Sequence, residues 1–140
     1  MVRSVLDANV YVSALIQPDG APGRLIERFL RDKAFEVVVS PAVVDEVLRV
    51  LTYPKVRRLT RAGAAPEVWF EDIVVLADMV VGESRVSGVC HDPDDDKYIA
   101  TALEGRAAYI VTGDQQFLEL REHEGLQIVN PRTFLDLLGS

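Results

Sequence analysis

The segment that decides the fold is Arg3-Ser4-Val5-Leu6-Asp7-Ala8-Asn9, in which an apolar run ends abruptly in a carboxylate. The run predicts a short buried strand, because apolar residues follow one another up to a polar break. A carboxylate at the end of such a strand loses hydration, so it must be paired, protonated or bound to a cation. The basic residues lie elsewhere in the sequence. A divalent metal ion is therefore the simplest partner for Asp7.

The rest of the chain alternates between apolar, β-branched runs and segments of helical period. This alternation predicts an α/β domain with a central, mainly parallel sheet flanked by helices. Strands are predicted at Arg3 to Leu6, Glu36 to Val39, Ala108 to Thr112 and Leu126 to Val129, with a weaker strand at Val80 to Val86. Helices are predicted at Val10 to Ile16, Pro22 to Asp32, Pro41 to Leu51, Pro66 to Val80, Pro93 to Glu104, Gln115 to Glu122 and Arg132 to Leu138.

Domain organisation follows from length and composition. The chain has 140 residues, 49% of them hydrophobic, and no shift of composition marks a boundary, so we expect a single domain over residues 1–140. Ser40 before Pro41 and Asp92 before Pro93 are well-formed helix N-caps. The least regular stretch, Tyr53 to Pro66, predicts a short helix and a loop.

The charge balance limits the kinds of partner. A net charge of −7, from 22 acidic and 15 basic residues, argues against a protein that holds nucleic acid by general electrostatic attraction. It does not exclude a nuclease, because bound metal would offset several of the acids. The locally basic segment Lys55 to Arg61 is interpreted as a solvated helix face and loop.

We expect a soluble, cytoplasmic protein that does not associate with a membrane. Cys90 is the single cysteine, so no internal disulfide can form, which fits a reducing compartment. We interpret Cys90 as a packed side chain and not as a catalytic thiol. The apolar start carries Asp7 and Asn9 within it and is no signal peptide. No apolar run approaches the roughly 18 residues that cross a bilayer.

Two acids follow predicted strands. Asp7 ends the first strand, and Asp114 comes two residues after the strand that ends at Thr112. The carboxyl ends of parallel strands meet at one edge of a sheet, where open α/β sheets bind ligands. Asp114 also has an ordinary structural interpretation, as the N-cap of the helix that begins at Gln115.

Glu46 lies on the border of the apolar stripe of its predicted helix, three residues after Val43. The structural alternative is an exposed position that pairs with Arg49. Asp45 points more toward solvent.

Four aspartates crowd the stretch after His91, and helical phase separates them. Asp92 is the N-cap. Asp95 falls on the same stripe as the apolar Tyr98, whereas Asp94 and Asp96 lean away from it. Acids in a first helical turn are also favoured by the helix dipole. We therefore choose Asp95 as the functional acid, with Asp96 and Asp92 as alternatives.

Taken together, these acids predict one pocket at one sheet edge. Ligands that are all oxygen, without cysteine or histidine, suit the hard ions Mg²⁺ and Mn²⁺. Such a site matches metal-assisted attack of water on a phosphodiester.

Four phrases of the sequence, in this order, resemble the PIN-domain family, most closely the VapC-like toxins of bacterial and archaeal toxin–antitoxin pairs. The phrases are Leu6-Asp7-Ala8-Asn9-Val10, Ser40-Pro41-Ala42-Val43-Val44-Asp45-Glu46-Val47, Asp92-Pro93-Asp94-Asp95-Asp96-Lys97-Tyr98-Ile99-Ala100 and Tyr109-Ile110-Val111-Thr112-Gly113-Asp114. Three consecutive aspartates at 94–96 are more than such relatives usually show, and this leaves the third acid open by one position.

The resemblance implies a ribonuclease that holds Mg²⁺ or Mn²⁺ and cleaves single-stranded regions of RNA. It also implies a homodimer that a cognate antitoxin silences. The catalytic acids that it implies are Asp7, Glu46, Asp95 and Asp114, of which Asp7, Asp95 and Asp114 bind metal. The supporting or alternative residues are Asn9, Ser40, Asp92, Asp96 and Thr112.

Two other functions stay open at this point. One is a catalytically silent PIN scaffold that binds RNA or a partner protein. The other is a phosphoacceptor or a phosphatase of the haloacid-dehalogenase type. Such a phosphatase needs a second acid two residues after the first, where this chain has Asn9.

Overall fold

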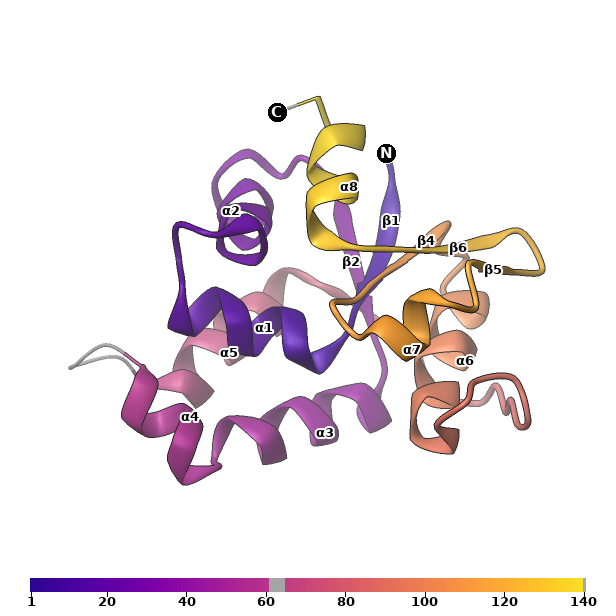
Figure 1. The fold of residues 1–140 in the computed structure, drawn as a ribbon, viewed down its shortest axis with the longest axis horizontal. Helices are drawn as coiled ribbons and strands as arrows, with labels where there is room; N and C mark the ends of the chain where they lie inside the picture. Colours follow the sequence, from indigo (N-terminus) through magenta and orange to yellow (C-terminus); the bar gives the residue numbers. More distant parts are fainter. Residues whose placement is uncertain (61–64, 140) are drawn as a thin grey trace.

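Figure 1 shows the computed structural model, which describes residues 1–60 and 65–139. In this part of the chain, a six-stranded sheet has the order β3-β2-β1-β4-β6-β5. All neighbouring strands run parallel except β5 and β6, which are antiparallel. The strands are β1 (Arg3–Leu6), β2 (Glu36–Val39), β3 (Asp78–Met79), β4 (Tyr109–Val111), β5 (Glu122–His123) and β6 (Leu126–Val129). The predicted α/β class with a mainly parallel sheet is confirmed.

Helices flank this sheet and cover its strands (Figure 1). They are α1 (Ala8–Ile16), α2 (Ala21–Glu27), α3 (Pro41–Leu51), α4 (Pro54–Leu59), α5 (Pro66–Leu76), α6 (Asp96–Glu104), α7 (Gln115–Leu118) and α8 (Pro131–Leu137). A π-helical turn, η1 (Arg28–Asp32), continues α2, and a 3₁₀ turn, η2 (Pro93–Asp95), leads into α6. None of the helices in the described part of the chain is long and apolar enough to cross a membrane.

The sequence predicts most elements correctly. The bounds of β1, β2, β6 and α3 are as predicted, and β4 is one residue shorter at each end. Ser40 and Asp92 both act as N-caps, because their side chains accept hydrogen bonds from backbone N–H groups of the following turn. The apolar runs fill the core, in which Leu6, Phe35 and Ile110 are fully or almost fully buried.

The predicted strand at Val80 to Val86 is wrong. The edge strand β3 covers Asp78–Met79 instead, and the predicted helix before it stops at Leu76 to let the chain turn. The backbone N–H groups of Gly82 and Ser84 donate to the Glu104 carboxylate at 3.0 and 3.1 Å, so they are not available to a strand ladder. The segment after β3 is therefore irregular chain fastened to the end of α6.

Three predicted helices also change character. The helix predicted at Pro22 to Asp32 divides into α2 and η1, and the one at Pro93 to Glu104 divides into η2 and α6. The helix from Gln115 ends at Leu118, and the following residues form the short strand β5, which the sequence did not predict. The short helix expected after Tyr53 is α4, while residues 61–64 of that stretch lie outside the described residues.

Candidate functional site

The carboxyl ends of β1 and β4 lie side by side. The two strands are parallel neighbours in which Leu6 is level with Val111, so Asp7 and Asp114 emerge at the same sheet edge. The starts of α1, α3 and α7 gather at this end of the strands (Figure 1). The two strands therefore end side by side, as the sequence predicts.

Asp7 is buried, with 6% of its surface exposed. Its Oδ2 accepts hydrogen bonds from Thr112 Oγ1 at 2.7 Å and from Asn9 Nδ2 at 3.1 Å. Burial raises the pKa of Asp7 above its usual value, the Thr112 hydrogen bond opposes this, and the charge of Glu46 adds to it. Asn9 also accepts from the Gly113 N–H at 3.1 Å, which ties the loop after β4 to the start of α1. Asn9 and Thr112 thus lie against Asp7 and orient its carboxylate.

Asp114 is the N-cap that one of its two sequence-based interpretations predicts. Its Oδ1 accepts from the Gln116 N–H at 3.1 Å, so it does cap α7. Its own N–H donates to Thr112 Oγ1 at 3.1 Å. The side chain is half-buried, and its charge raises the pKa of Asp95. A capping aspartate keeps oxygen lone pairs for a second partner.

Glu46, on α3, is held by groups of α6. Lys97 Nζ donates to Glu46 Oε2 at 2.7 Å, and the Tyr98 hydroxyl donates to Oε1. Tyr98 also accepts from the Ala8 N–H at 3.2 Å, so one hydroxyl joins α6, α3 and the start of α1. The expected partner Arg49 is more distant, at 3.7 Å. The sequence-based statement that cations lie away from the acids is therefore wrong for Glu46.

Sequence reasoning missed Lys97 and Tyr98 as site residues. Both stand in a phrase that resembles the PIN family, but their contacts reach a residue 51 and 52 positions earlier in the chain. The apolar stripe identified Tyr98 as buried without identifying what its hydroxyl contacts. A buried tyrosine that follows acids is the signal available in the sequence, because buried hydroxyls almost always have a partner.

The charges of four other acids raise the pKa of Asp95. Its pKa is raised to about 7, first by burial and then by the charges of Asp7, Asp92, Asp114 and Glu46. These residues come from the end of β1, from α3, from the turn before α6 and from the loop after β4. Four carboxylates that raise the pKa of a fifth lie near it, so Asp7, Glu46, Asp92, Asp95 and Asp114 form one set of neighbouring acids, called the acidic group below.

The sequence-based assignment of burial within the aspartate run is wrong. Asp95 is only half-buried, whereas Asp96, expected to lean away from the core, is 5% exposed. The 3₁₀ turn at η2 turns further per residue than an α-helix, which shifts the phase of the residues after it. Asp96 Oδ1 accepts from the Cys90 N–H at 2.7 Å. Asp96 thus fastens the chain before η2, while Asp95 stays with the other acids.

Three of the supporting or alternative candidates serve local structure. Asp92 is exposed and caps η2 by accepting from the Asp94 N–H at 3.0 Å. Ser40 caps α3, and its hydroxyl lies 2.7 Å from that of Thr101. Ser40 and Asp96 line a polar cleft of about 380 Å³ beside α6, whose lining does not include Asp7, Glu46, Asp95 or Asp114.

Cys90 fits the interpretation as a packed side chain. Burial and the nearby Asp96 raise the pKa of its thiol to about 12. A thiol with that pKa carries almost no thiolate near neutral pH, so it is a poor nucleophile.

The oxygen donors of the acidic group are of the kind that a hard cation prefers. They are not arranged as a complete metal site. Within residues 1–60 and 65–139, no three carboxylate, imidazole or thiol groups lie close enough together to hold a metal ion as they stand. Asp7 is turned to Thr112 and Asn9, and Glu46 is drawn to Lys97. The donors are nonetheless all carboxylate oxygens, and their repulsion at Asp95 is what a divalent cation would relieve. The chemistry of the donors therefore fits a hard ion.

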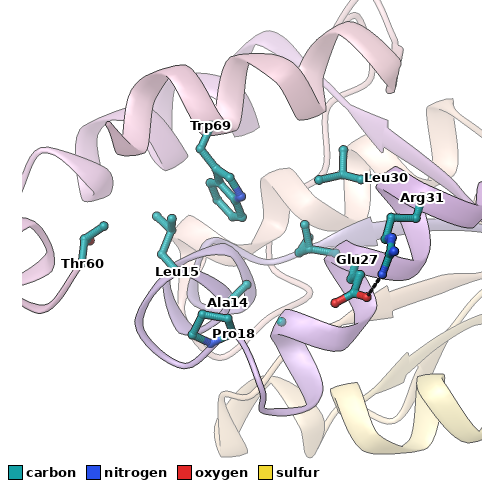
Figure 2. Close-up of a pocket in the computed structure, with 10 residues that line it drawn as sticks. Ala14, Leu15, Pro18, Glu27, Leu30, Arg31, Thr60 and Trp69 are labelled. Atoms are coloured by element: carbon teal, nitrogen blue, oxygen red, sulfur yellow. Dashed lines mark hydrogen bonds and ion pairs between the residues drawn. The ribbon is translucent and has the colours of Figure 1, made fainter. Parts of the chain in front are cut away.

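A separate apolar pocket of about 520 Å³ lies away from these acids, and no predicted site residue lines it. Figure 2 shows Leu15 and Trp69 on its wall, with the Glu27–Arg31 ion pair at one side, where Nη1 and Oε1 are 2.6 Å apart. In the basic segment, Lys55 and Arg58 are exposed on α4, as expected of a solvated face, and Arg61 lies outside the described residues.

Comparisons with known proteins agree with this geometry. A family model described as PIN domain matches residues 3–116, which include all four predicted catalytic acids. The chain is 28% identical over 146 residues to the uncharacterized protein MJ1680 of Methanocaldococcus jannaschii, covering 96% of this chain and 90% of that protein.

A solved structure is also similar. It is a chain from the crystal structure of VapBC2 from Rickettsia felis bound to a DNA fragment from their promoter. The superposition has a TM-score of 0.59 and covers 92% of this chain and 98% of the other, at 14% sequence identity. An identity this low supports the fold alone.

Proposed function

This chain belongs to the PIN domain family, and from that premise we propose that it is a metal-dependent endoribonuclease and the toxin of a toxin–antitoxin pair. PIN domains are generally nucleases. One observation supports the proposal for this chain: Asp7 and Asp114 follow neighbouring parallel strands at the same end of the sheet, where the charges of Asp7, Asp114 and Glu46 raise the pKa of Asp95. Carboxylates that repel one another destabilise the folded protein, and a bound cation would offset this repulsion.

We propose Asp7, Asp95 and Asp114 as the ligands of Mg²⁺ or Mn²⁺. When bound, such an ion lowers the pKa of a water molecule and offsets the charge that builds up on the phosphate. Asp7 is already oriented for this role, because Thr112 and Asn9 both bond the same carboxylate oxygen.

Glu46 has a different role in this proposal. Its carboxylate is held between Lys97 and the Tyr98 hydroxyl, so it keeps a fixed position beside the metal ligands. A carboxylate in that position accepts the proton of the attacking water as a general base.

The substrate is proposed to be single-stranded RNA. A chain with a net charge of −7 cannot hold a long duplex by general attraction, so contacts must be few and local. A flexible single strand can bring one phosphodiester to an acidic edge without presenting the charge of a second strand. The resemblance of the four sequence phrases to ribonuclease toxins supports the same choice.

The proposed partners are a cognate antitoxin and a second copy of this chain, in the cytoplasm, with residues 1–140 as one domain. The similar Rickettsia felis structure is of VapBC2 bound to promoter DNA, and the same arrangement is proposed here. Co-expression with a small protein encoded by the adjacent reading frame should give a stable complex that does not cleave RNA. A protein that is purified alone should elute as a dimer in size-exclusion chromatography with light scattering.

The activity is tested by incubating the purified protein with a labelled single-stranded RNA and with DNA of the same sequence, in Mn²⁺ or in EDTA. We expect cleavage of RNA in Mn²⁺ only. Binding of RNA without cleavage would favour a silent scaffold and contradict the proposal. A gain of one phosphoryl group from a small phosphodonor, measured by intact mass, would favour a phosphoacceptor instead.

A further inference from the structure

Lys97 contacts the acidic group and also lines a polar cleft beside α6. Its Nζ donates to Glu46 Oε2 at 2.7 Å, and its side chain also lines the polar cleft of about 380 Å³ beside α6. The lysine side chain is 24% exposed, so solvent reaches it although its charge is paired. The cleft, called the α6 cleft below, is lined among others by Ser40, Ser84, Arg85, Lys97, Thr101 and Glu104.

The acidic side chains of the α6 cleft mostly serve the backbone. Glu104 accepts from the Gly82 and Ser84 N–H groups, and Asp96 accepts from Cys90 N–H. The cations keep spare donors. Lys97 has three N–H bonds, of which the ammonium uses one on Glu46. Arg85 Nη1 donates to the carbonyl groups of Gly82 and Ser84, and among the described residues its other N–H groups have no hydrogen-bond partner beyond these carbonyls, so they can donate to a ligand. Asp94 is the third acid of the cleft, and it is exposed to solvent. The two cations, Lys97 and Arg85, thus have N–H donors that an anion can use.

Lys97 is also placed where an RNA strand needs a cation. Among the described residues, Lys97 and Arg49 are the basic side chains within 4 Å of a carboxylate of the acidic group, and Arg49 is mostly exposed at 63%. A phosphate that approaches several carboxylates is repelled unless a cation meets it. When Lys97 Nζ turns from Glu46 to a phosphate, the lysine charge stays paired. Glu46 is then still held by the Tyr98 hydroxyl, and its oxygen Oε2 can accept a proton.

From this placement we propose that the α6 cleft receives the nucleotide that adjoins the cleaved bond, and that Lys97 binds its phosphate, with Arg85 as a second contact. The inference rests on the proposed ribonuclease function and names the part of the surface that the substrate occupies. A cleft of this volume is within the range that holds a ligand of nucleotide size.

The test is the affinity for RNA, measured without hydrolysis. Anisotropy of a short fluorescein-labelled single-stranded RNA is recorded in Ca²⁺ in place of Mn²⁺, and a gel checks that the RNA stays intact. Lys97→Met should weaken binding about tenfold and reduce the salt dependence of log Kd by about 0.7, the value for one phosphate contact of a single strand. Arg85→Met should weaken binding less, in the same direction.

Lys33→Met is the matched control, because it makes the same charge change at the end of η1. It should leave RNA affinity within about twofold, since distant exposed charges are screened. Lys97→Arg should recover most of the affinity, because it restores the charge and the donors. Lys97→Gln replaces the methionine variant if that variant does not fold, as judged by circular dichroism. Mn²⁺ binding, followed by electron paramagnetic resonance, should persist in each variant.

The outcomes separate this inference from the proposed function. If the wild type cleaves RNA and Lys97→Met binds it as tightly as Lys33→Met does, Lys97 is a structural ion-pair partner and the inference is wrong. If Lys97→Met weakens binding but Arg85→Met does not, the nucleotide does not lie in the α6 cleft. If the wild type neither binds nor cleaves RNA, the proposed function itself fails.

Discussion

Thr112 and Asp7 join the ends of two neighbouring strands through a hydrogen bond of 2.7 Å from Oγ1 to Oδ2. The residues are 105 positions apart in the chain, and the bond forms because β4 lies parallel to β1. Thr112 and Asn9 both bond Oδ2 of this buried carboxylate and so fix its orientation. The parallel pairing of β1 and β4 thus brings Asp7 and Asp114 to the same end of the sheet, and hydrogen bonds from Thr112 and Asn9 orient the Asp7 carboxylate.

The first prediction concerns pH. The pKa of Asp95 in the folded protein is raised to about 7 from 3.8, so folding favours its protonated form. This contribution is fully present below pH about 4 and is lost as the pH rises through about 7. In EDTA, Asp95→Asn should therefore be more stable than the wild type at pH 8 and equally stable at pH 3.5.

Urea denaturation at several pH values measures this difference. Asp94→Asn, an exposed change in the same run, is the control and should show no such pH dependence. A difference between Asp95→Asn and the wild type that stayed constant across this range would mean that Asp95 does not sense the other acids.

The second prediction compares two buried tyrosines, both 0% exposed. The Tyr98 hydroxyl donates to Glu46 and accepts from the Ala8 N–H, whereas the Tyr11 hydroxyl has no hydrogen-bond partner within residues 1–60 and 65–139. Tyr98→Phe should lower the free energy of unfolding by about 1–3 kcal/mol, because two buried groups lose their partner. Tyr11→Phe should leave it unchanged or raise it by up to about 1 kcal/mol.

Because both variants remove one oxygen from a buried ring, they control for each other. Thermal and urea unfolding give the two signs. Equal destabilisation by the two changes would show that the Tyr98 hydroxyl does not join α6 to α3.

The third prediction separates Asp95 from Asp96. Asp96→Ala should cost about 1–3 kcal/mol of stability, because the Cys90 N–H loses its acceptor, and should leave Mn²⁺-dependent cleavage largely intact. Asp95→Asn should remove most of the cleavage without loss of stability. The conservative Asp96→Asn should hurt cleavage less than Asp95→Asn does. The reverse order of activities would move the third acid of the site by one position.

The sequence predicted most helices and strands, and it predicted that the carboxyl ends of β1 and β4 lie together. Apolar runs of fixed period predict β1, β2, β6 and α3 well, because each buries a continuous face. The two-residue strands β3 and β5 are not predictable in this way, since only their partner strands make them strands. The irregular chain after β3 takes its shape from Glu104, a contact that no local pattern contains.

At the site, residue types were predictable and side-chain partners were not. The four acids stand out because each follows or borders an apolar run. The contact of Lys97 with Glu46 depends on how α6 packs beside α3, so the sequence did not disclose that a cation lies among the acids. A 3₁₀ turn at η2 reversed the expected burial of Asp95 and Asp96, because helical phase was counted from the wrong start.

The most direct test of the central claim is Mn²⁺-dependent cleavage of single-stranded RNA by Asp7→Asn beside Asp45→Asn. Both substitutions remove one negative charge, but Asp45 is exposed on α3 and Asp7 is buried at the sheet edge. We predict that Asp7→Asn is folded, is at least as stable as the wild type in EDTA, and has lost cleavage, while Asp45→Asn cleaves normally. Undiminished cleavage by Asp7→Asn would contradict the account.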